Sequence, residues 1–325
     1  DFRPAIALTF WGKLISGRRR CLLFGGSTEN SSLECSGKRI CTIYLLRIYK
    51  PNEMRTVACL LLLTSLAVQT TARELMIDRA YMKCLYRYVY LNDTLTEKTK
   101  DDLLILQIGK SISKCFSHYS NQVDSLSALP NGDMIIGKMI NDAMNSGEFM
   151  RGNYPHKRLK TYIYKNYPEG CMTVTDGLIL QDYRYVDSLH TQTWTMGDST
   201  REVLGYTCQQ ATADFRGRHW TAWFATDIPV SDGPWKLGGL PGLILEAYDK
   251  GHQYTFTAVG LEQVKGEPIV FTPCREKSGY RTVDRHAFLK AKMFDMTHGG
   301  ALGASGLVST DHKSVYMDLI ERDYK

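Results

Sequence analysis

The sequence predicts an α+β fold that consists mainly of antiparallel β-strands, and two observations favour it. From Lys160 onward, segments rich in aromatic and β-branched residues recur about every 8–12 residues with polar turns between them, which is typical of an antiparallel meander. Apolar residues near helical spacing occur in 133–146 and 281–297. We therefore expect a curved meander sheet, with an open half-barrel as its alternative form, and one or two flanking helices.

Residues 54–72 have the pattern of a secretory signal peptide. Met54 is the first methionine, Arg55 is positively charged, and 57–68 form an apolar run. Thr70 and Ala72 occupy the −3 and −1 positions of a small-residue cleavage site, so the pattern predicts cleavage after Ala72.

A signal peptide that begins at Met54 leaves residues 1–53 as translated upstream sequence or a disordered extension. A genuine N-terminal extension with a membrane anchor is the alternative. We expect a periplasmic or secreted protein without a transmembrane span in the mature chain. Its domain would be a single β-rich one over 73–298, followed by a flexible Gly/Ser-rich tail at 299–325.

Removing residues 1–72 changes the charge balance. The whole chain has 40 Lys+Arg, 34 Asp+Glu and a net charge of +6, but without 1–72 there remain 30 of each. A neutral mature chain has no general attraction for nucleic acid, so we expect no nucleic-acid partner.

The mature part of the chain contains five cysteines, and an oxidising compartment permits disulfides there. We expect Cys84 to approach Cys115 and Cys208 to pair with Cys274 or Cys171, although sequence does not fix connectivity. No CxxC, zinc-finger spacing or HExxH motif occurs, so we expect neither a metal site nor a cofactor.

The sequence of the N-terminal half of the mature chain predicts a hairpin and a helix. Met82–Leu91 reads as a strand and 103–119 as one or two more. The pattern of 133–146 predicts a helix with Asp133 as N-cap and Gly147 as its stop. We interpret its methionine-rich stripe as core packing rather than as a binding face.

Successive strands are predicted in the C-terminal half, followed by a helix over 281–297. The strands lie within 160–167, 170–176, 178–188, 191–198, 202–215, 218–229, 242–249 and 253–264.

A glycine- and proline-rich loop precedes the strand that begins at Leu243. Gly238, Gly239 and Gly242 permit positive φ or close backbone approach, and Pro241 fixes φ between them. Anion binding is the alternative, but a strand follows the loop where a helix N-terminus would be needed. We therefore interpret the loop as a tightly packed crossover.

The loop also carries a resemblance to a known family. The motif GLPGLIL at Gly239–Leu245 resembles the motif of the GLPGLI family of exported Bacteroidetes proteins, and the block 204–249 is similar to the family's central block. The matching features of that block are Gly205, Tyr206, Cys208, Arg216-Gly217-Arg218, Trp223, Ile228-Pro229 and Gly233-Pro234. The resemblance implies export and a β-rich fold, and it implies no established activity.

Two groups of residues are candidates for binding. Arg216 and Arg218 could fork onto a carboxylate or phosphate, or form an ion pair with Asp214 or Asp227. In the loop, we expect Trp235 to be exposed and to contact a partner or an apolar ligand. The full set of ligand- or partner-binding candidates is Trp235, Gly238, Gly239, Leu240, Pro241, Gly242, Arg216, Arg218 and Trp223.

The first functional hypothesis is a non-catalytic envelope protein that binds an apolar or peptide ligand, or an envelope partner, on the concave face of the sheet. The alternative is a periplasmic hydrolase that uses Cys208 with His219 and Asp227, or another His–carboxylate pair. A metal-handling role for scattered His and Cys residues is a weaker third hypothesis. No catalytic residue is assigned.

Overall fold

The computed structural model describes residues 75–178, 181–274, 279–298 and 318–324. They all belong to one unit, Arg73–Lys325. The predicted signal peptide and the segment before it lie outside the described residues.

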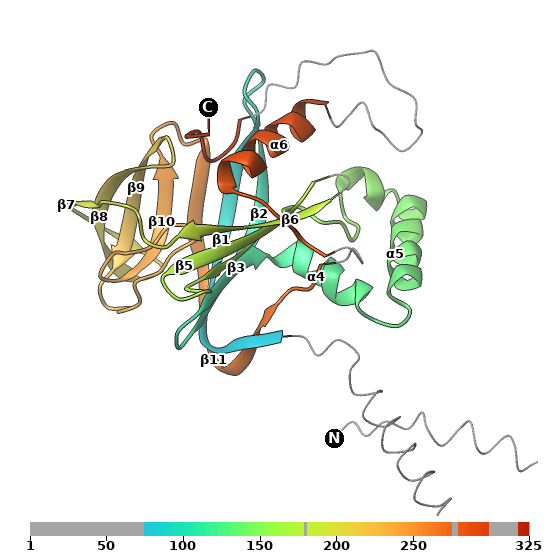
Figure 1. Ribbon diagram of the computed structural model, residues 1–325, viewed down its shortest axis with the longest axis horizontal. Coiled ribbons are helices and arrows are strands. Elements are labelled where there is room, and N and C mark those ends of the chain that lie inside the picture. Colours follow the sequence, from blue (N-terminus) through green and yellow to red (C-terminus); the bar gives the residue numbers. More distant parts are fainter. Residues whose placement is uncertain (1–74, 179–180, 275–278, 299–317, 325) are drawn as a thin grey trace, which may run out of the picture. The chain divides into compact units, whose positions relative to one another are not determined.

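One twelve-stranded sheet organises the unit, in the order β12-β6-β5-β4-β3-β2-β1-β11-β10-β9-β8-β7 (Figure 1). It consists of two meanders, β1 to β6 and β7 to β11, which join where the long strands β1 and β11 pair. All neighbours are antiparallel except β12 and β6. The strands are β1 Leu75–Asp93, β2 Lys98–Gly109, β3 Ser113–Ser117, β4 Tyr162–Lys165, β5 Cys171–Gly177, β6 Asp182–Ser188, β7 Thr195–Val203, β8 Tyr206–Phe215, β9 Arg218–Ala225, β10 Leu243–Asp249, β11 Tyr254–Phe271 and β12 Arg281–Thr282.

The predicted α+β class is confirmed. The sheet is large, curved and open, since β12 and β7 are its two edges and it does not close into a barrel. Each predicted strand corresponds to an observed one, because aromatic and β-branched residues favour strands and the polar turns between them mark the strand ends.

The helices are α4 His118–Ser127, α5 Gly132–Ser146, α6 Arg285–His298 and the short 3₁₀ helix η1 Glu148–Arg151. Gly147 ends α5 with φ of 75°, as predicted. The N-cap prediction was wrong: Asn131 is the N-cap and Asp133 lies in the first turn. The sequence did not predict α4, which begins at the Ser117 cap and interrupts the expected strand 103–119.

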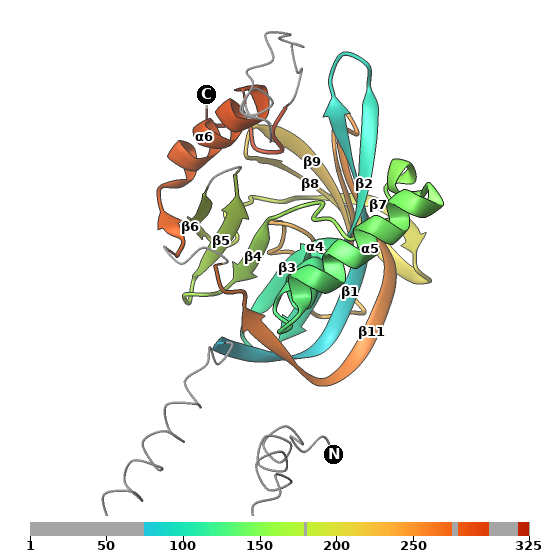
Figure 2. The same ribbon diagram turned by 90° about the vertical axis from the view of Figure 1, so that its right-hand side faces the viewer.

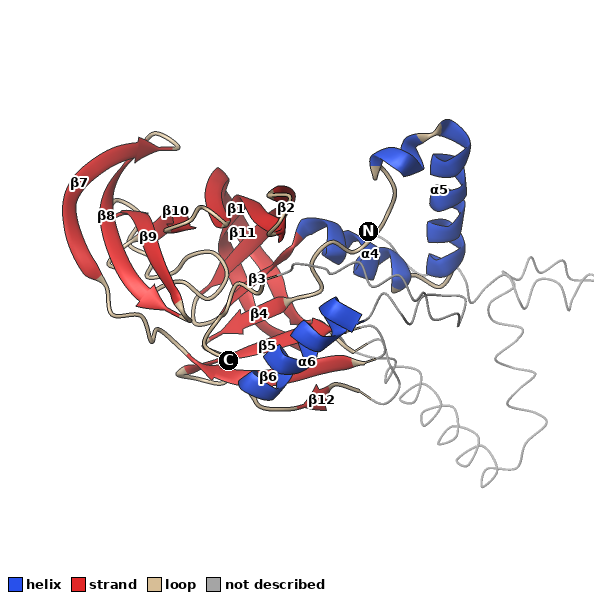
Figure 3. Cartoon of the chain, turned by 90° about the horizontal axis from the view of Figure 1, so that it is seen from above, coloured by secondary structure: helices blue, strands red, loops and turns tan. Residues whose placement is uncertain are grey.

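The methionine stripe of α5 is not core, contrary to the prediction. Met134 is 74% exposed and Met144 is 60% exposed, while Ala143 is buried. The reason is that α5 contacts α4 and η1 and projects away from the sheet (Figure 3), so one narrow face suffices for its packing.

The two faces of the sheet have different covers. Cys84, Leu106 and Cys115 point to the main core, and their strand neighbours point the opposite way because side chains alternate along a strand. The loop 226–242 and α6 pack on this core face, while α4 packs on the other, the outer face, against β2 and β3. Figure 2 shows α6 beside β6, separate from α4 and α5.

Part of the expected flexible tail is docked. Residues 318–324 lie against the unit with Leu319, Glu321 and Tyr324 buried. Ion pairs with residues far away in the sequence hold them, and such partners are invisible to composition. Among the described residues, no helix has the length and apolar character required to cross a membrane.

Candidate functional site

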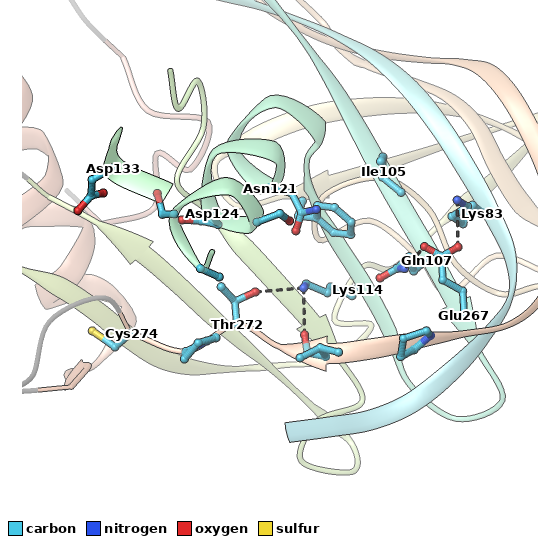
Figure 4. A pocket seen from close by; sticks show the side chains of 17 residues that line it. Lys83, Ile105, Gln107, Lys114, Asn121, Asp124, Asp133, Glu267, Thr272 and Cys274 are labelled. Carbon is cyan, nitrogen blue, oxygen red and sulfur yellow. Dashed lines mark hydrogen bonds and ion pairs between the residues drawn. The ribbon is translucent and has the colours of Figure 1, made fainter. Parts of the chain in front are cut away.

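The outer face carries a pocket of about 510 Å³, which we call the outer-face pocket (Figure 4). Its volume falls within the range typical of ligand sites, roughly 300–1,000 Å³. Strands β1, β2, β3 and β11 form its floor and α4 forms one wall. Its lining residues are Lys83, Ile105, Gln107, Lys114, Phe116, Asn121, Asp124, Ser125, Ser127, Ala128, Asp133, Glu267, Pro268, Val270, Thr272, Pro273 and Cys274.

Three residues from neighbouring strands form a charged cluster at one end of the pocket. Lys83 on β1 lies 3.0 Å from Glu267 on β11, and Gln107 on β2 donates a hydrogen bond to Glu267 at 3.3 Å. The hydrogen bond to Glu267 raises the pKa of Lys83 above its ordinary value. This end therefore carries a fixed positive charge beside a carboxylate and an amide.

Lys114 occupies the middle of the floor. Its ammonium donates to the Val270 carbonyl at 2.9 Å and to the Thr272 hydroxyl at 3.1 Å. It also lies 4.8 Å from the ring centre of Phe116 and 5.0 Å from that of Tyr162, close enough for cation–π attraction. These contacts explain how a buried lysine is tolerated on this face.

Helix α4 supplies the other end. Asn121 and Asp124 face the pocket from α4. The Asp124 carboxylate pairs with Lys157 at 2.5 Å and accepts the Tyr162 hydroxyl, so it is fixed in place. The Ser127 hydroxyl is buried and has no hydrogen-bond partner within the described part of the chain.

The arrangement suits a polar ligand that offers both donors and acceptors. One end presents ammonium, carboxylate and amide groups, the other presents an amide, a carboxylate and a hydroxyl, and Ile105 and Phe116 lie between them. Among the described residues no cluster of His, Cys, Asp and Glu could hold a metal ion.

The glycine-rich loop is packed as the sequence predicted. A Cβ on Gly242 would lie 2.1 Å from the Ala225 carbonyl oxygen, and one on Gly238 would lie 2.9 Å from the His190 ring. Gly239 has φ of +88°, which disfavours a side chain. Leu240 is buried and Pro241 exposed.

Trp235 is not exposed, contrary to the expectation. It is 8% exposed, and its ring lies 5.6 Å from Trp220 and 5.7 Å from Phe215. The loop folds back over the core face, so its indole joins the core. Trp223 is buried too, with the Arg201 guanidinium 4.2 Å above its ring.

Two buried lysines that the sequence analysis missed fix this loop. Lys165 on β4 donates to Asp232 at 2.6 Å and to the carbonyls of Gly233 and Leu237 at 2.6 and 2.8 Å. Lys236 on the loop pairs with Asp187 at 2.9 Å and Glu321 at 2.6 Å. Lys165 lies outside any motif, and although Lys236 lies in the glycine-rich loop, nothing local indicates that a lysine there is buried.

Arg216 and Arg218 form structural ion pairs, but not with Asp214 or Asp227. Arg216 contacts Asp187 at 2.5 Å and Arg218 contacts Asp249 at 2.8 Å. Both also reach the docked segment 318–324, at Asp323 and Asp318. The two side chains therefore both point toward the segment 318–324.

The expected pairing of Cys84 with Cys115 does not occur, and no disulfide joins two cysteines of the described residues. Cys84, Cys115, Cys171 and Cys208 are free thiols. Cys84 and Cys115 lie in register on β1 and β3 with Leu106 of β2 between them. Two strand spacings are about 10 Å, whereas a disulfide requires Cα atoms within about 7 Å.

The burial of Cys84 and Cys115 leads to a prediction for thiol labelling. Burial raises the pKa of Cys84 to about 12 and that of Cys115 to about 11, so almost no thiolate exists at pH 8. We expect iodoacetamide to leave both unmodified in the native protein and to modify Cys84, Cys115, Cys171 and Cys208 after denaturation without reductant. Peptide mapping by mass spectrometry checks this, and a pair that needs reductant would contradict it.

The groups of the predicted hydrolase do not meet. Cys208 is fully buried near the start of β8, its pKa is raised by burial, and its sulfur lies 3.5 Å from the Tyr206 carbonyl. His219 bonds Asp214 at 2.8 Å at the far end of the β8–β9 hairpin, where both side chains are largely exposed. Asp227 lies near the Cys208 end.

Fold and site together define an open antiparallel β-sheet protein with a polar, ligand-sized pocket on the outer face. Residues 178–287 match the family model described as "N-glycanase peptide, N-terminal domain". This region runs from the end of β5 to the start of α6 and includes the glycine-rich loop.

Solved structures give a more distant likeness. A structure of PNGF-II in space group C2 is similar with a TM-score of 0.40 and 15% identity, covering 65% of this chain and 32% of that chain. PNGF-II in space group P21 gives a TM-score of 0.42 and 13% identity, with 66% and 33% covered. The present chain spans about a third of the length of these proteins. A search of curated proteins gives no significant match.

Proposed function

We propose that this chain is an exported, non-catalytic binding protein that takes a peptide ligand in the outer-face pocket. The observation that carries the proposal is the pocket's lining, in which donors and acceptors lie at both ends, and Lys114 lies between them with the apolar side chains of Ile105 and Phe116. A peptide presents amide donors and carbonyl acceptors along its length with side chains between them. The buried, unpaired Ser127 hydroxyl is a further group that such a ligand would satisfy.

Peptide binding is tested with the full chain in two steps. Native mass spectrometry of the purified protein is compared with its denatured mass, since extra mass lost on denaturation is a co-purified ligand. Fluorescence anisotropy with a panel of labelled 12-residue peptides of mixed charge then measures affinity.

The decisive variant is Asn121→Ala, which removes one pocket amide from α4. We expect affinity to fall about tenfold, the usual effect of one lost hydrogen bond to a ligand. Gln122→Ala is the matched control, because Gln122 is exposed and does not line this pocket, and we expect its affinity to stay within twofold of the original. Equal effects of the two substitutions, or no binding by any peptide, would refute the proposal.

A glycosylated peptide is the second candidate ligand, and the family match over 178–287 favours it. The family model is described as "N-glycanase peptide, N-terminal domain". The same peptide with and without one N-linked glycan separates the two candidates. Tighter binding of the glycosylated form supports the second, and equal binding supports the first.

Hydrolysis by Cys208 or by His219 with Asp214 is the enzymatic alternative. It requires Cys208→Ser or His219→Ala to abolish turnover of a bound peptide. We expect neither substitution to alter peptide affinity, because Cys208 is buried in the core and His219 lies on a hairpin end away from the pocket lining.

A further inference from the structure

The docked C-terminal segment Asp318–Tyr324 lies in a cleft lined by cationic side chains from separate elements. Arg216 and Arg218 come from the β8–β9 hairpin, Lys236 from the glycine-rich loop and Arg285 from α6. The segment supplies the complementary charges through Asp318, Glu321 and Asp323, and it forms no helix or strand. We call this place the C-terminal cleft.

The cleft recognises the backbone of the segment as well as its charges. Arg218 donates from Nε to the Ile320 carbonyl at 2.8 Å and from Nη2 to the Leu319 carbonyl at 2.8 Å. The Tyr254 hydroxyl donates to the Asp318 carbonyl at 2.8 Å. Three consecutive backbone carbonyls of the segment therefore accept hydrogen bonds from side chains of the cleft.

Side-chain recognition centres on Glu321. Its carboxylate contacts Lys236 and Arg285, each at 2.6 Å, and its side chain is 2% exposed. Leu319 packs into the main core beside it. An apolar cavity of about 150 Å³ continues from Leu319 along the core face toward Tyr88 and Trp235.

We propose that the C-terminal cleft is a peptide-recognition site whose occupant is exchangeable, so that it accepts the same segment from a second copy of this chain. The contacts are those of a short bound peptide: one aliphatic anchor, one buried carboxylate and backbone carbonyls that accept hydrogen bonds from the cleft. The sequence observed to fit is this chain's own, and reciprocal exchange of an identical element reproduces every contact in a dimer. The proposal is independent of what the outer-face pocket binds.

The test uses a chain that folds intact and is then cut. A protease site inserted after Ser305 allows cleavage after folding, which turns the segment into a non-covalent fragment. The probe is a fluorescein-labelled synthetic peptide with the sequence Asp318–Lys325, the segment that a second copy would supply. We expect a saturable rise in anisotropy with the cut protein that unlabelled peptide reverses, and circular dichroism unchanged by cutting.

Two matched peptides establish specificity. Glu321→Gln removes the charge held by Lys236 and Arg285, and we expect binding at least thirtyfold weaker, roughly the effect of breaking a buried charge pair. Arg322→Gln changes the neighbouring side chain, which is 39% exposed. We expect this peptide to bind about fivefold more weakly or less than that. The proposal is overturned if the cut protein loses its fold, if the bound fragment resists displacement by peptide, or if both substitutions act equally.

Discussion

The substitution Gly242→Ala is expected to lower the free energy of unfolding by about 3 kcal/mol or more, at the upper end of overpacking effects. The new Cβ would lie 2.1 Å from the Ala225 carbonyl oxygen and 2.6 Å from the carbonyl carbon. These atoms belong to the backbone at the end of β9, which pairs with β10 directly after the glycine, so no flexible side chain can give way. Relieving this steric clash therefore requires a shift of the strand or of the loop.

Gly137→Ala is the matched control for this prediction. Gly137 lies inside α5, and a Cβ there meets nothing within 4 Å. Alanine is the better helix former, so stability should rise by about 0.5–1 kcal/mol. Guanidinium unfolding of both variants checks the pair, and a Gly242→Ala protein within 1 kcal/mol of the original would show that the loop is not packed against β9.

Lys165→Met has the second large expected effect, a loss of about 3–5 kcal/mol, because it leaves one member of a buried ion pair uncompensated. Lys165 donates three hydrogen bonds, to Asp232 and to two carbonyls of the loop. Methionine fills a similar volume but donates none of them. The Asp232 carboxylate then stays buried beside two unpaired carbonyls.

A double-mutant cycle separates the charge pair from the rest of the effect. Asp232→Asn removes the carboxylate, so the loss in the double variant should be smaller than the sum of the two single losses. Lys138→Met on the exposed side of α5 is the control and should change stability by less than about 0.5 kcal/mol. Additive losses in the cycle would contradict a coupled Lys165–Asp232 pair.

The strands and the glycine-rich loop could be predicted from the sequence, because their determinants are local. Alternation in segments such as Met82–Leu91 follows from one buried face, and the three glycines mark backbone that a side chain would obstruct. The helix α4 was missed, since it is short and its start depends on the Ser117 cap directly after a strand.

The candidate site could not be predicted in this way. The outer-face pocket joins Lys83, Gln107 and Glu267, and the last of these is 160 positions from Gln107. Their meeting depends on the pairing of β1 with both β2 and β11, which is decided by the whole sheet. The burial of Trp235 could not be predicted either. A tryptophan beside glycines can be exposed or buried, and only the path of the loop over the core decides which.

The sequence by itself therefore determined the strand-rich α+β class, the order of the strands from β1 to β11 and the tight packing of the glycine-rich loop. Tertiary structure alone decided that Arg216 and Arg218 hold the C-terminal segment, that Cys84 and Cys115 stay apart, and that the polar pocket lies on the outer face. The physical reason is the sequence separation over which each interaction acts. Backbone preference and alternation act over a few residues, whereas a buried charge or thiol is defined by partners that only the folded sheet brings within a few ångströms.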